Sequence, residues 1–337
     1  MIAAGTAELP VQLWQIFYTI VLPVLLLAGT GCLLQKLFRL DLATLRVLNF
    51  YFVIPAIVYH SVLTSQVGGG QVLVVVGFAL SLMAGMSVLT LLAAWLRGVP
   101  MEQRRALLMT TIFHNSGNYG LPLQDLAFRA RGLAVEATTV QTYVMITQNF
   151  TTFTLGILLA AGGASRRRWR ENLRHMAKFP PLYALGAALL TIQIERWLGG
   201  SAETLRGALR PFWEVIVRVR GAFVPIALVT LGAQLMTVAR GRHNYHVSLS
   251  VMLRLLCGPA VGLGLVYLFG LSGFMAQVLL ISTTTPTAVN CMLLCLEFDN
   301  HPDYAARAVF YSTLLSPLTV TLVIYLARSG LLPGLAF

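Results

Sequence analysis

The sequence predicts an all-α membrane protein that crosses the bilayer several times. Of its 337 residues, 57% are hydrophobic and 11% are charged, whereas soluble domains carry about 25% charged residues. Charged residues are also absent from long stretches, such as those between Arg46 and Arg97 and between Arg254 and Glu297. Because a membrane-spanning helix needs about 20 apolar residues, each of these stretches is long enough for two spans.

The apolar runs predict ten membrane-spanning helices. Loops that follow the odd-numbered spans hold more arginine and lysine than the other loops, so the positive-inside rule assigns them to the cytoplasm and both chain ends to the outside. The predicted spans are residues 11–34, 43–64, 71–96, 105–127, 135–160, 179–198, 213–237, 246–269, 274–297 and 304–327.

A basic segment near the middle divides the chain into two halves. We expect a first five-helix repeat at residues 1–162, a basic cytoplasmic linker at 163–178, and a second five-helix repeat at 179–337. Because five is an odd number, the second repeat would insert upside down relative to the first. The linker, with Arg166–Arg168 and Arg170, is expected to lie on anionic lipid of the inner leaflet.

A faint internal similarity favours inverted repeats. Pro55 in the second span and Pro225 in the seventh have similar neighbours and lie 170 residues apart, while Pro122 and Pro286 lie 164 residues apart. Similar offsets at two landmarks are typical of repeated transporter halves. Chance is the alternative interpretation, since prolines are common in membrane spans.

Several function classes are disfavoured by the same sequence. The net charge of +12 comes from short loops between spans, so nucleic acid is not an expected partner. Cysteines lie inside predicted spans without a ligand pattern, and no phosphate-binding loop is present, so we expect no metal, no cofactor and no ATP-driven activity. His114 and Ser116 form the nearest nucleophile–base pair, but residues two apart on a helix do not face each other. An enzyme is therefore not expected.

The stretch from His114 to Pro122 is the most unusual part of the sequence. It places two carboxamides, two glycines and a proline inside a predicted span, although proline and glycine destabilise a helix interior. Irregular backbone at membrane depth is tolerated only inside protein or beside a water-filled cavity. We therefore expect the fourth span to break at Pro122 and the ninth at Thr283–Pro286. Helix N-termini at such breaks would attract an anion without any fixed cation.

Polar side chains near the two breaks are the candidate ligands for a solute. Asn115, Asn118 and Asn290 would supply amide donors, and Thr284 and Thr285 would supply hydroxyl groups. The alternative is that these groups only bond to the interrupted backbone. Gln148 in span five is expected to form a polar wall of the site, or else an interhelical hydrogen bond.

Two ionisable residues in or near spans, His60 and Asp125, could couple transport to an ion. His60 could titrate near neutral pH, although an interior histidine without a coupling role is the alternative. Asp125 could carry a proton or reach a sodium ion, although we expect it close to the membrane interface. Arg254 is expected to extend to the cytoplasmic interface.

The pattern Asn115-x-Gly117-Asn118-x-Gly120-x-Pro122-Leu123 resembles the signature of the auxin efflux carrier family. That family includes bacterial permeases linked to malate and malonate and the plant PIN-type carriers. The resemblance implies a scaffold helix bundle packed beside a bundle in which broken helices four and nine cross, as in bile-acid symporters and sodium–proton antiporters. It also implies a site at the crossing and alternating access. Together with the polar residues above, it predicts a substrate site formed by Asn115, Gly117, Asn118, Tyr119, Gly120, Pro122, Gln148, Thr284, Thr285, Pro286 and Asn290.

These observations predict a secondary transporter that moves a small organic anion, such as malate, malonate or an auxin-like acid, by alternating access. The alternative is a membrane sensor or scaffold that binds a metabolite or lipid on the same fold. The resemblance implies a bacterial inner membrane. The substrate, the direction of transport, coupling to protons or sodium, and formation of a homodimer stay open at this point.

Overall fold

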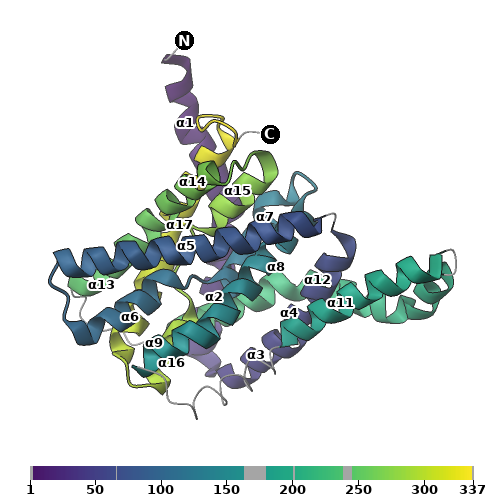
Figure 1. Ribbon diagram of the computed structural model, residues 1–337, viewed down its shortest axis with the longest axis horizontal. Helices are drawn as coiled ribbons and strands as arrows, with labels where there is room; N and C mark the ends of the chain where they lie inside the picture. The colour runs from purple at the N-terminus through teal and green to yellow at the C-terminus, as the bar shows by residue number, and fades with distance from the viewer. Residues whose placement is uncertain (1–2, 66, 163–179, 200–201, 238–244, 336–337) are drawn as a thin grey trace.

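The computed structural model describes residues 3–65, 67–162, 180–199, 202–237 and 245–335. All regular secondary structure within these ranges is helical, as Figure 1 shows. The predicted linker at 163–178 lies outside the described residues. Helix α1 (Ala3–Ile16) and the last described residues of the chain, after α17 (Pro302–Arg328), lie at the same end of the molecule (Figure 1).

Among the residues that the structure describes, seven helical stretches are long and apolar enough to cross a membrane, which confirms the prediction of an all-α, multi-pass membrane protein. The other three predicted spans correspond to α11 (Pro180–Leu198), which is long enough but less apolar, and to two stretches in which the helix is interrupted. The seven stretches are Leu9–Phe38, Leu42–Thr64, Gly69–Leu96, Ala134–Ala161, Gly207–Thr237, His246–Leu268 and Pro302–Arg328.

The first half of the chain contains the helices up to α9. Several of them are joined through short π-helical segments (η). The elements are α1 (Ala3–Ile16), η1 (Phe17–Val21), α2 (Leu22–Phe38), α3 (Leu42–Leu48), η2 (Asn49–Val53), α4 (Ile54–Thr64), α5 (Gly69–Leu96), α6 (Met101–Ile112), η3 (Ser116–Gly120), α7 (Leu121–Arg129), α8 (Ala134–Thr151), η4 (Thr152–Gly156) and α9 (Ile157–Ala161).

The second half repeats this mixture of long and interrupted helices. Its elements are α11 (Pro180–Leu198), α12 (Ala202–Thr237), α13 (Tyr245–Met252), η6 (Leu253–Cys257), α14 (Gly258–Leu268), α15 (Gly273–Ser282), α16 (Val289–Glu297) and α17 (Pro302–Arg328).

Four of the π-helical segments end just before a helix with proline in its first turn. The prolines are Pro23 in α2, Pro55 in α4, Pro122 in α7 and Pro259 in α14. A prolyl ring has no N–H and clashes with the carbonyl four residues earlier. A wider π turn upstream accommodates the ring, so the chain remains helical at Pro122, and the expectation of a break at that residue is wrong.

One group of helices, here called the scaffold group, contains α2, α3–α4, α11 and α12. Helix α2 packs along α12, and α4 packs along α11 and α12. Glycines allow the first of these contacts: a Cβ at Gly31 would lie 2.1 Å from the Val229 carbonyl oxygen, and one at Gly232 would lie 1.8 Å from the Ala28 carbonyl oxygen. Close backbone approach through small residues is typical of helix pairs in membranes.

Helices α5–α9 and α13–α17 form the second group, here called the crossing group. Helix α5 passes in front of this group in Figure 1 and contacts α6, α8 and α14. The outer faces of both groups carry exposed apolar side chains, for example Leu73, Leu33 and Leu318. Such faces suit contact with lipid, whereas a soluble monomer rarely exposes large apolar patches.

Candidate functional site

Two interruptions of the helical path meet inside the crossing group. Helix α6 ends at Ile112 and α15 ends at Ser282, and the chain that follows each of them is non-helical. His114 and Thr287 form an isolated antiparallel bridge. The Asn115 N–H donates to the Pro286 carbonyl at 2.7 Å, and the Ala288 N–H donates to the Phe113 carbonyl at 3.0 Å. The two interruptions therefore satisfy part of each other's backbone.

Side chains complete the hydrogen bonds of the helix ends. The last carbonyls of a helix have no intrahelical partner. At the end of α6, the Thr287 hydroxyl donates to the Thr110 carbonyl at 2.8 Å, and the Cys291 thiol donates to the Met109 carbonyl at 3.2 Å. Side chains in and just after the second interruption thus satisfy carbonyls at the end of α6.

The threonines that follow α15 donate hydrogen bonds to the last carbonyls of that helix. The hydroxyl of Thr283 donates to the Leu280 carbonyl at 2.7 Å. The hydroxyls of Thr284 and Thr285 donate to the carbonyls of Ile281 and Ser282 at 2.6 and 2.9 Å. These bonds correspond to the alternative considered above, in which the threonines bond to the interrupted backbone.

A buried arginine joins the same two helix ends. Arg254 in η6 is fully buried, and its guanidinium donates to the Thr111 carbonyl at 3.0 Å and to the Thr283 carbonyl at 2.5 Å. The expectation that Arg254 extends to the membrane interface is therefore wrong. A fixed cation, which the sequence interpretation did not include, lies where the two interruptions meet.

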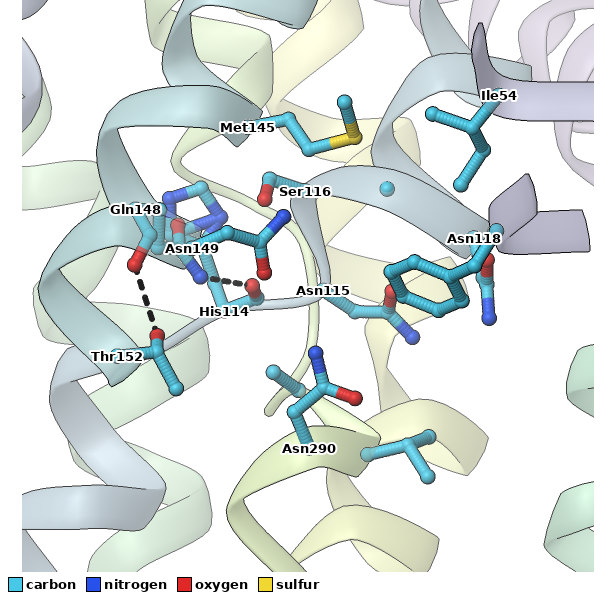
Figure 2. Close-up of a pocket in the computed structure, with 14 residues that line it drawn as sticks. Ile54, His114, Asn115, Ser116, Asn118, Met145, Gln148, Asn149, Thr152 and Asn290 are labelled. Carbon is cyan, nitrogen blue, oxygen red and sulfur yellow. Dashed lines mark hydrogen bonds between the residues drawn. The ribbon is translucent and has the colours of Figure 1, made fainter. Parts of the chain in front are cut away.

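A small pocket opens beside the interruptions, between the scaffold and crossing groups. Its cavity volume is about 30 Å³, enough for about two water molecules. Carboxamides and hydroxyls dominate one side of it, as Figure 2 shows, and apolar side chains form the rest. The lining residues are Phe50, Ile54, His114, Asn115, Ser116, Gly117, Asn118, Met145, Gln148, Asn149, Thr152, Ala288, Val289 and Asn290.

Five of the eleven predicted substrate residues line this pocket: Asn115, Gly117, Asn118, Gln148 and Asn290. In Figure 2, Asn115 and Asn290 reach toward the same space from the two different interruptions. The Asn115 Nδ2 is buried and has no hydrogen-bond partner. A carboxamide donor is therefore available inside the pocket.

Asn118 and Gln148 carry the other two predicted carboxamides, and their hydrogen bonds show how these side chains are oriented. The Asn118 Oδ1 accepts from the Asn49 Nδ2 at 2.8 Å, which links the crossing group to the scaffold group. The Gln148 Nε2 donates to the His114 carbonyl, while its Oε1 has no partner. Gln148 and its neighbour Asn149 both line the pocket.

Six predicted substrate residues are not part of the lining: Tyr119, Gly120, Pro122, Thr284, Thr285 and Pro286. The Tyr119 hydroxyl accepts from the Ser316 hydroxyl at 3.0 Å. Gly120 leaves room for a neighbour, because a Cβ there would lie 2.5 Å from the Gln141 Nε2. Tyr119 and Gly120 therefore position the chain after the first interruption through contacts with Ser316 and Gln141.

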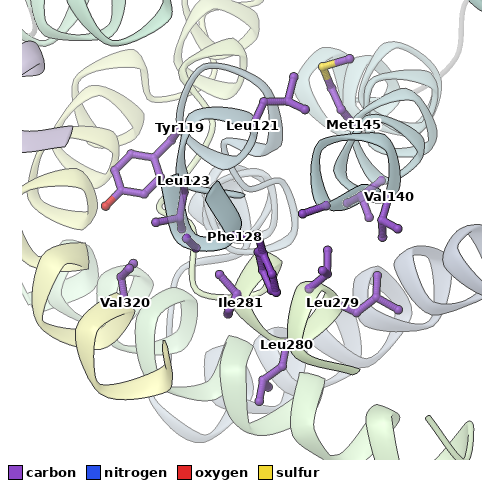
Figure 3. Packing of buried hydrophobic residues seen from close by; sticks show 14 of the residues in the cluster. Tyr119, Leu121, Leu123, Phe128, Val140, Met145, Leu279, Leu280, Ile281 and Val320 are labelled. Atoms are coloured by element: carbon purple, nitrogen blue, oxygen red, sulfur yellow. The ribbon is translucent and has the colours of Figure 1, made fainter. Parts of the chain in front are cut away.

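Hydrophobic packing fixes the two interrupted helices next to the pocket. Figure 3 shows Leu121 and Phe128 of α7, Val140 of α8 and Leu280 of α15 in one buried cluster. The ring of Phe128 meets that of Phe274 edge to face, with centroids 5.3 Å apart. This packing holds α7 and α15 together beside the pocket.

The two candidate coupling residues lie away from the pocket lining. His60 is buried and stacks on Trp213, with ring centroids 5.0 Å apart. Asp125 forms an ion pair with Arg129, one helical turn away. Among the residues the structure describes, no group of three His, Cys, Asp or Glu side chains could hold a metal ion.

The sequence did not predict the role of three polar residues: Asn49, which bonds to Asn118, and Asn149 and Thr152, which line the pocket. Asn49 was not among the predicted site residues, although an asparagine in an apolar run is itself a signal. The polar residues Asn149 and Thr152 carried the same signal. For the remaining lining residues that were not predicted, namely Phe50, Ile54, His114, Ser116, Met145, Ala288 and Val289, only the three-dimensional contacts identify the role.

Comparisons with known proteins indicate a membrane transporter. A family model described as "Membrane transport protein" matches residues 213–324. That region includes α15, α16 and most of α12 and α17, and therefore the second interruption.

Two archaeal relatives extend the similarity over the rest of the chain. An uncharacterized transporter of Methanothermobacter thermautotrophicus is 29% identical over 311 residues, which is 90% of this chain and 95% of the relative. An uncharacterized transporter of Methanocaldococcus jannaschii is 24% identical over 221 residues, which is 66% of this chain and 68% of the relative. The matches support a multi-pass membrane transporter and indicate no family of enzymes.

Proposed function

We propose that the protein is a secondary transporter for a small organic anion, and that the pocket beside the two interruptions binds the anionic group. The observation that carries the proposal is the unpartnered donor of Asn115 in a pocket with no carboxylate in its lining. Helix α16 begins at this pocket, and its N-cap residue Ala288 supplies no side-chain cap. The first N–H groups of a helix attract anions.

The size of the pocket supports recognition of a carboxylate group. A volume of about 30 Å³ suits the two oxygens of a carboxylate, which would replace about two waters. The rest of a molecule such as malate, malonate or an auxin-like acid needs more space. We infer that the pocket widens when the substrate enters.

The position of the pocket supports alternating access. Phe50 and Ile54 belong to the scaffold group, whereas the other lining residues belong to the crossing group. A movement of one group against the other would open the pocket to either side of the membrane, as in carriers built from two bundles.

We further propose ten spans in two inverted repeats, with helices four and nine broken and crossed. Reciprocal helix contacts support the repeat. Exchanging the halves converts the pair α2–α12 into α11–α4, the pair α6–α17 into α15–α8, and the pair α7–α8 into α16–α17, and each of these pairs is in contact. A pseudo-two-fold axis would produce this pattern. Under this proposal, residues 1–162 and 179–337 are the repeats, and both ends lie outside a bacterial inner membrane.

Transport into proteoliposomes tests the function. Purified protein would be reconstituted, and uptake of radiolabelled malate, malonate and indole-3-acetate would be measured against protein-free liposomes. We expect uptake of at least one acid, and its loss in Asn118→Ala and Asn290→Ala variants that keep the wild-type melting temperature. Gln71→Ala is a matched control, because this carboxamide caps α5 at an exposed position and does not line the pocket.

The same experiment separates the alternatives. Uptake that persists in both asparagine variants would contradict the site. Binding of an acid without turnover would favour a sensor or scaffold instead of a carrier. Coupling through His60 or Asp125 stays a prediction, and it requires that His60→Gln or Asp125→Asn changes the response of uptake to an imposed proton or sodium gradient. Homodimer formation and the contact with anionic lipid are likewise predictions, which native mass spectrometry in lipid can test.

A further inference from the structure

Arg254 is positioned as a counter-charge to two helix C-termini. Its two hydrogen bonds reach the carbonyls of Thr111 and Thr283, which lie at the ends of α6 and α15. The C-terminus of a helix carries a partial negative charge of roughly half an elementary unit. One guanidinium therefore faces two partial negative charges from the two interrupted helices.

Within the described part of the chain, no carboxylate forms an ion pair with Arg254. Ion pairs elsewhere in this part of the chain include those of Arg129 with Asp125 and of Arg218 with Glu214. A buried charge without a partner is strongly unfavourable, and the side chain of Arg254 has no exposed surface. The two helix ends therefore supply the compensating negative charge.

The helix that carries Arg254 leaves space for the guanidinium. A Cβ at Gly258, one turn later, would lie 2.4 Å from the Arg254 Nη2 and 3.2 Å from the Thr283 carbonyl oxygen. A Cβ at Gly262, a further turn along, would lie 2.6 Å from the Thr283 Cγ2. Two glycines thus allow the end of α15 to approach η6 and α14 closely enough for the arginine to bridge it.

In carriers with broken helices, unwound carbonyls and half-helix C-termini are the groups that coordinate a sodium ion or a proton. We propose that Arg254 is a tethered cation that occupies such a monovalent-cation position between α6 and α15. The crossing consequently needs no sodium, and the fixed positive charge favours an anion in the adjacent pocket. This last consequence rests on the proposed transport function, whereas occupation of the cation position does not.

Melting temperatures of the purified protein, measured without any organic anion, test the inference. Wild-type protein is compared in sodium chloride, choline chloride and low-millimolar guanidinium chloride at equal ionic strength. We expect the same melting temperature in sodium and choline for the wild type. The Arg254→Ala variant should melt several degrees lower and should regain part of the loss with guanidinium or sodium, because a ligand of the folded state raises its stability. Arg254→Lys should need no added cation.

Control variants separate this role from a general loss of charge. Arg218→Ala removes an arginine whose side chain is 81% exposed, and it should show no difference between salts. Gly258→Ala keeps the charge of Arg254 but displaces the guanidinium, so it should lower the melting temperature even if Arg254→Ala cannot be purified. A sodium-specific stabilisation of the wild type, or Gly258→Ala with an unchanged melting temperature, would overturn the inference.

Transport assays keep the two proposals apart. If no acid is transported but the melting results are as expected, the transport function fails and the tethered cation stands. If an acid is transported only in the presence of sodium, the tethered cation fails and the transport function stands.

Discussion

The first interruption, after α6, presents Asn115, Ser116 and Asn118 to the pocket. The second, after α15, contains the three consecutive threonines 283–285, but their hydroxyls donate to carbonyls of α15 and do not line the pocket. The second interruption reaches the pocket instead through Asn290, in the first turn of α16.

Position relative to the end of the helix explains this difference. A threonine hydroxyl in a helix readily donates to the carbonyl three or four residues earlier. The same behaviour occurs at the end of α6, where the hydroxyls of Thr110 and Thr111 donate to the carbonyls of Ala106 and Leu107. In both halves, threonines at the end of the helix bond to its last carbonyls, and asparagines further along the chain remain available to the pocket.

The largest effect should follow from Asn290→Ala. Loss of a hydrogen bond to a charged ligand costs about 1.5–3 kcal/mol, so the affinity for the transported acid should fall about 10- to 100-fold. Thr284→Val, which removes a hydroxyl that donates to the end of α15, should change the affinity less than about 3-fold. Isothermal titration of the two variants measures the contrast. Equal losses in both would show that position relative to the helix end does not decide the role.

The contact between the two interruptions should be tested with Thr287→Val. This substitution keeps the shape of the side chain but removes the donor to the Thr110 carbonyl, which is 2.8 Å away. A buried acceptor left without a partner costs about 1–3 kcal/mol, so the free energy of unfolding should fall by that amount. Chemical denaturation in detergent measures it, with Thr19→Val as the control, since Thr19 donates to Gln15 at an exposed site. Equal stability of Thr287→Val and wild type would contradict the mutual closure of the helix ends.

The sequence identified the all-α class and the region of both interruptions, because these depend on local composition. It misplaced the first interruption at Pro122, since a proline in the first turn of α7 is tolerated after a π turn. The position of the break at residues 113–115 depends on pairing with Pro286 and Thr287, which are about 170 residues away in the chain. No local pattern contains that information.

Arg254 shows the same limit for charged residues. Hydropathy does not distinguish an arginine that extends to lipid headgroups from one that is buried, because both lie in apolar runs. What buries Arg254 is a pair of carbonyls at Thr111 and Thr283, 143 and 29 residues away. Gly258 was the local indication, since a glycine one turn after the arginine leaves the space that the guanidinium fills.

Ala288→Ser should have a smaller effect, which raises the stability of the protein and lowers its affinity for the anion. Ala288 is the N-cap of α16 and has an extended backbone, with φ −69° and ψ 137°, which a capping serine also adopts. A serine hydroxyl would bond to N–H groups of α16 and stabilise the protein by about 0.5–2 kcal/mol. If the anion uses the same N–H groups, its affinity should fall by a comparable factor. Higher melting temperature with unchanged affinity would exclude the start of α16 as part of the binding site.

The start of α3 provides the reference for a capped helix and the smallest expected effect. Asp41 accepts hydrogen bonds from the hydroxyl and N–H of Thr44 and from the N–H of Ala43, and the Thr44 hydroxyl is the main cause of a pKa lowered from 3.8. A lowered pKa in the folded state means that the stabilisation is complete above the ordinary carboxyl pKa and is lost as the pH falls through the lowered value. Wild-type melting temperatures should therefore decline slightly below about pH 4. In Asp41→Asn, which can still cap but cannot ionise, this part of the decline should be absent. A decline identical to that of the wild type would mean that the cap of α3 contributes nothing to the acid sensitivity, and Ala288→Ser would then lack a measured reference for what a cap adds.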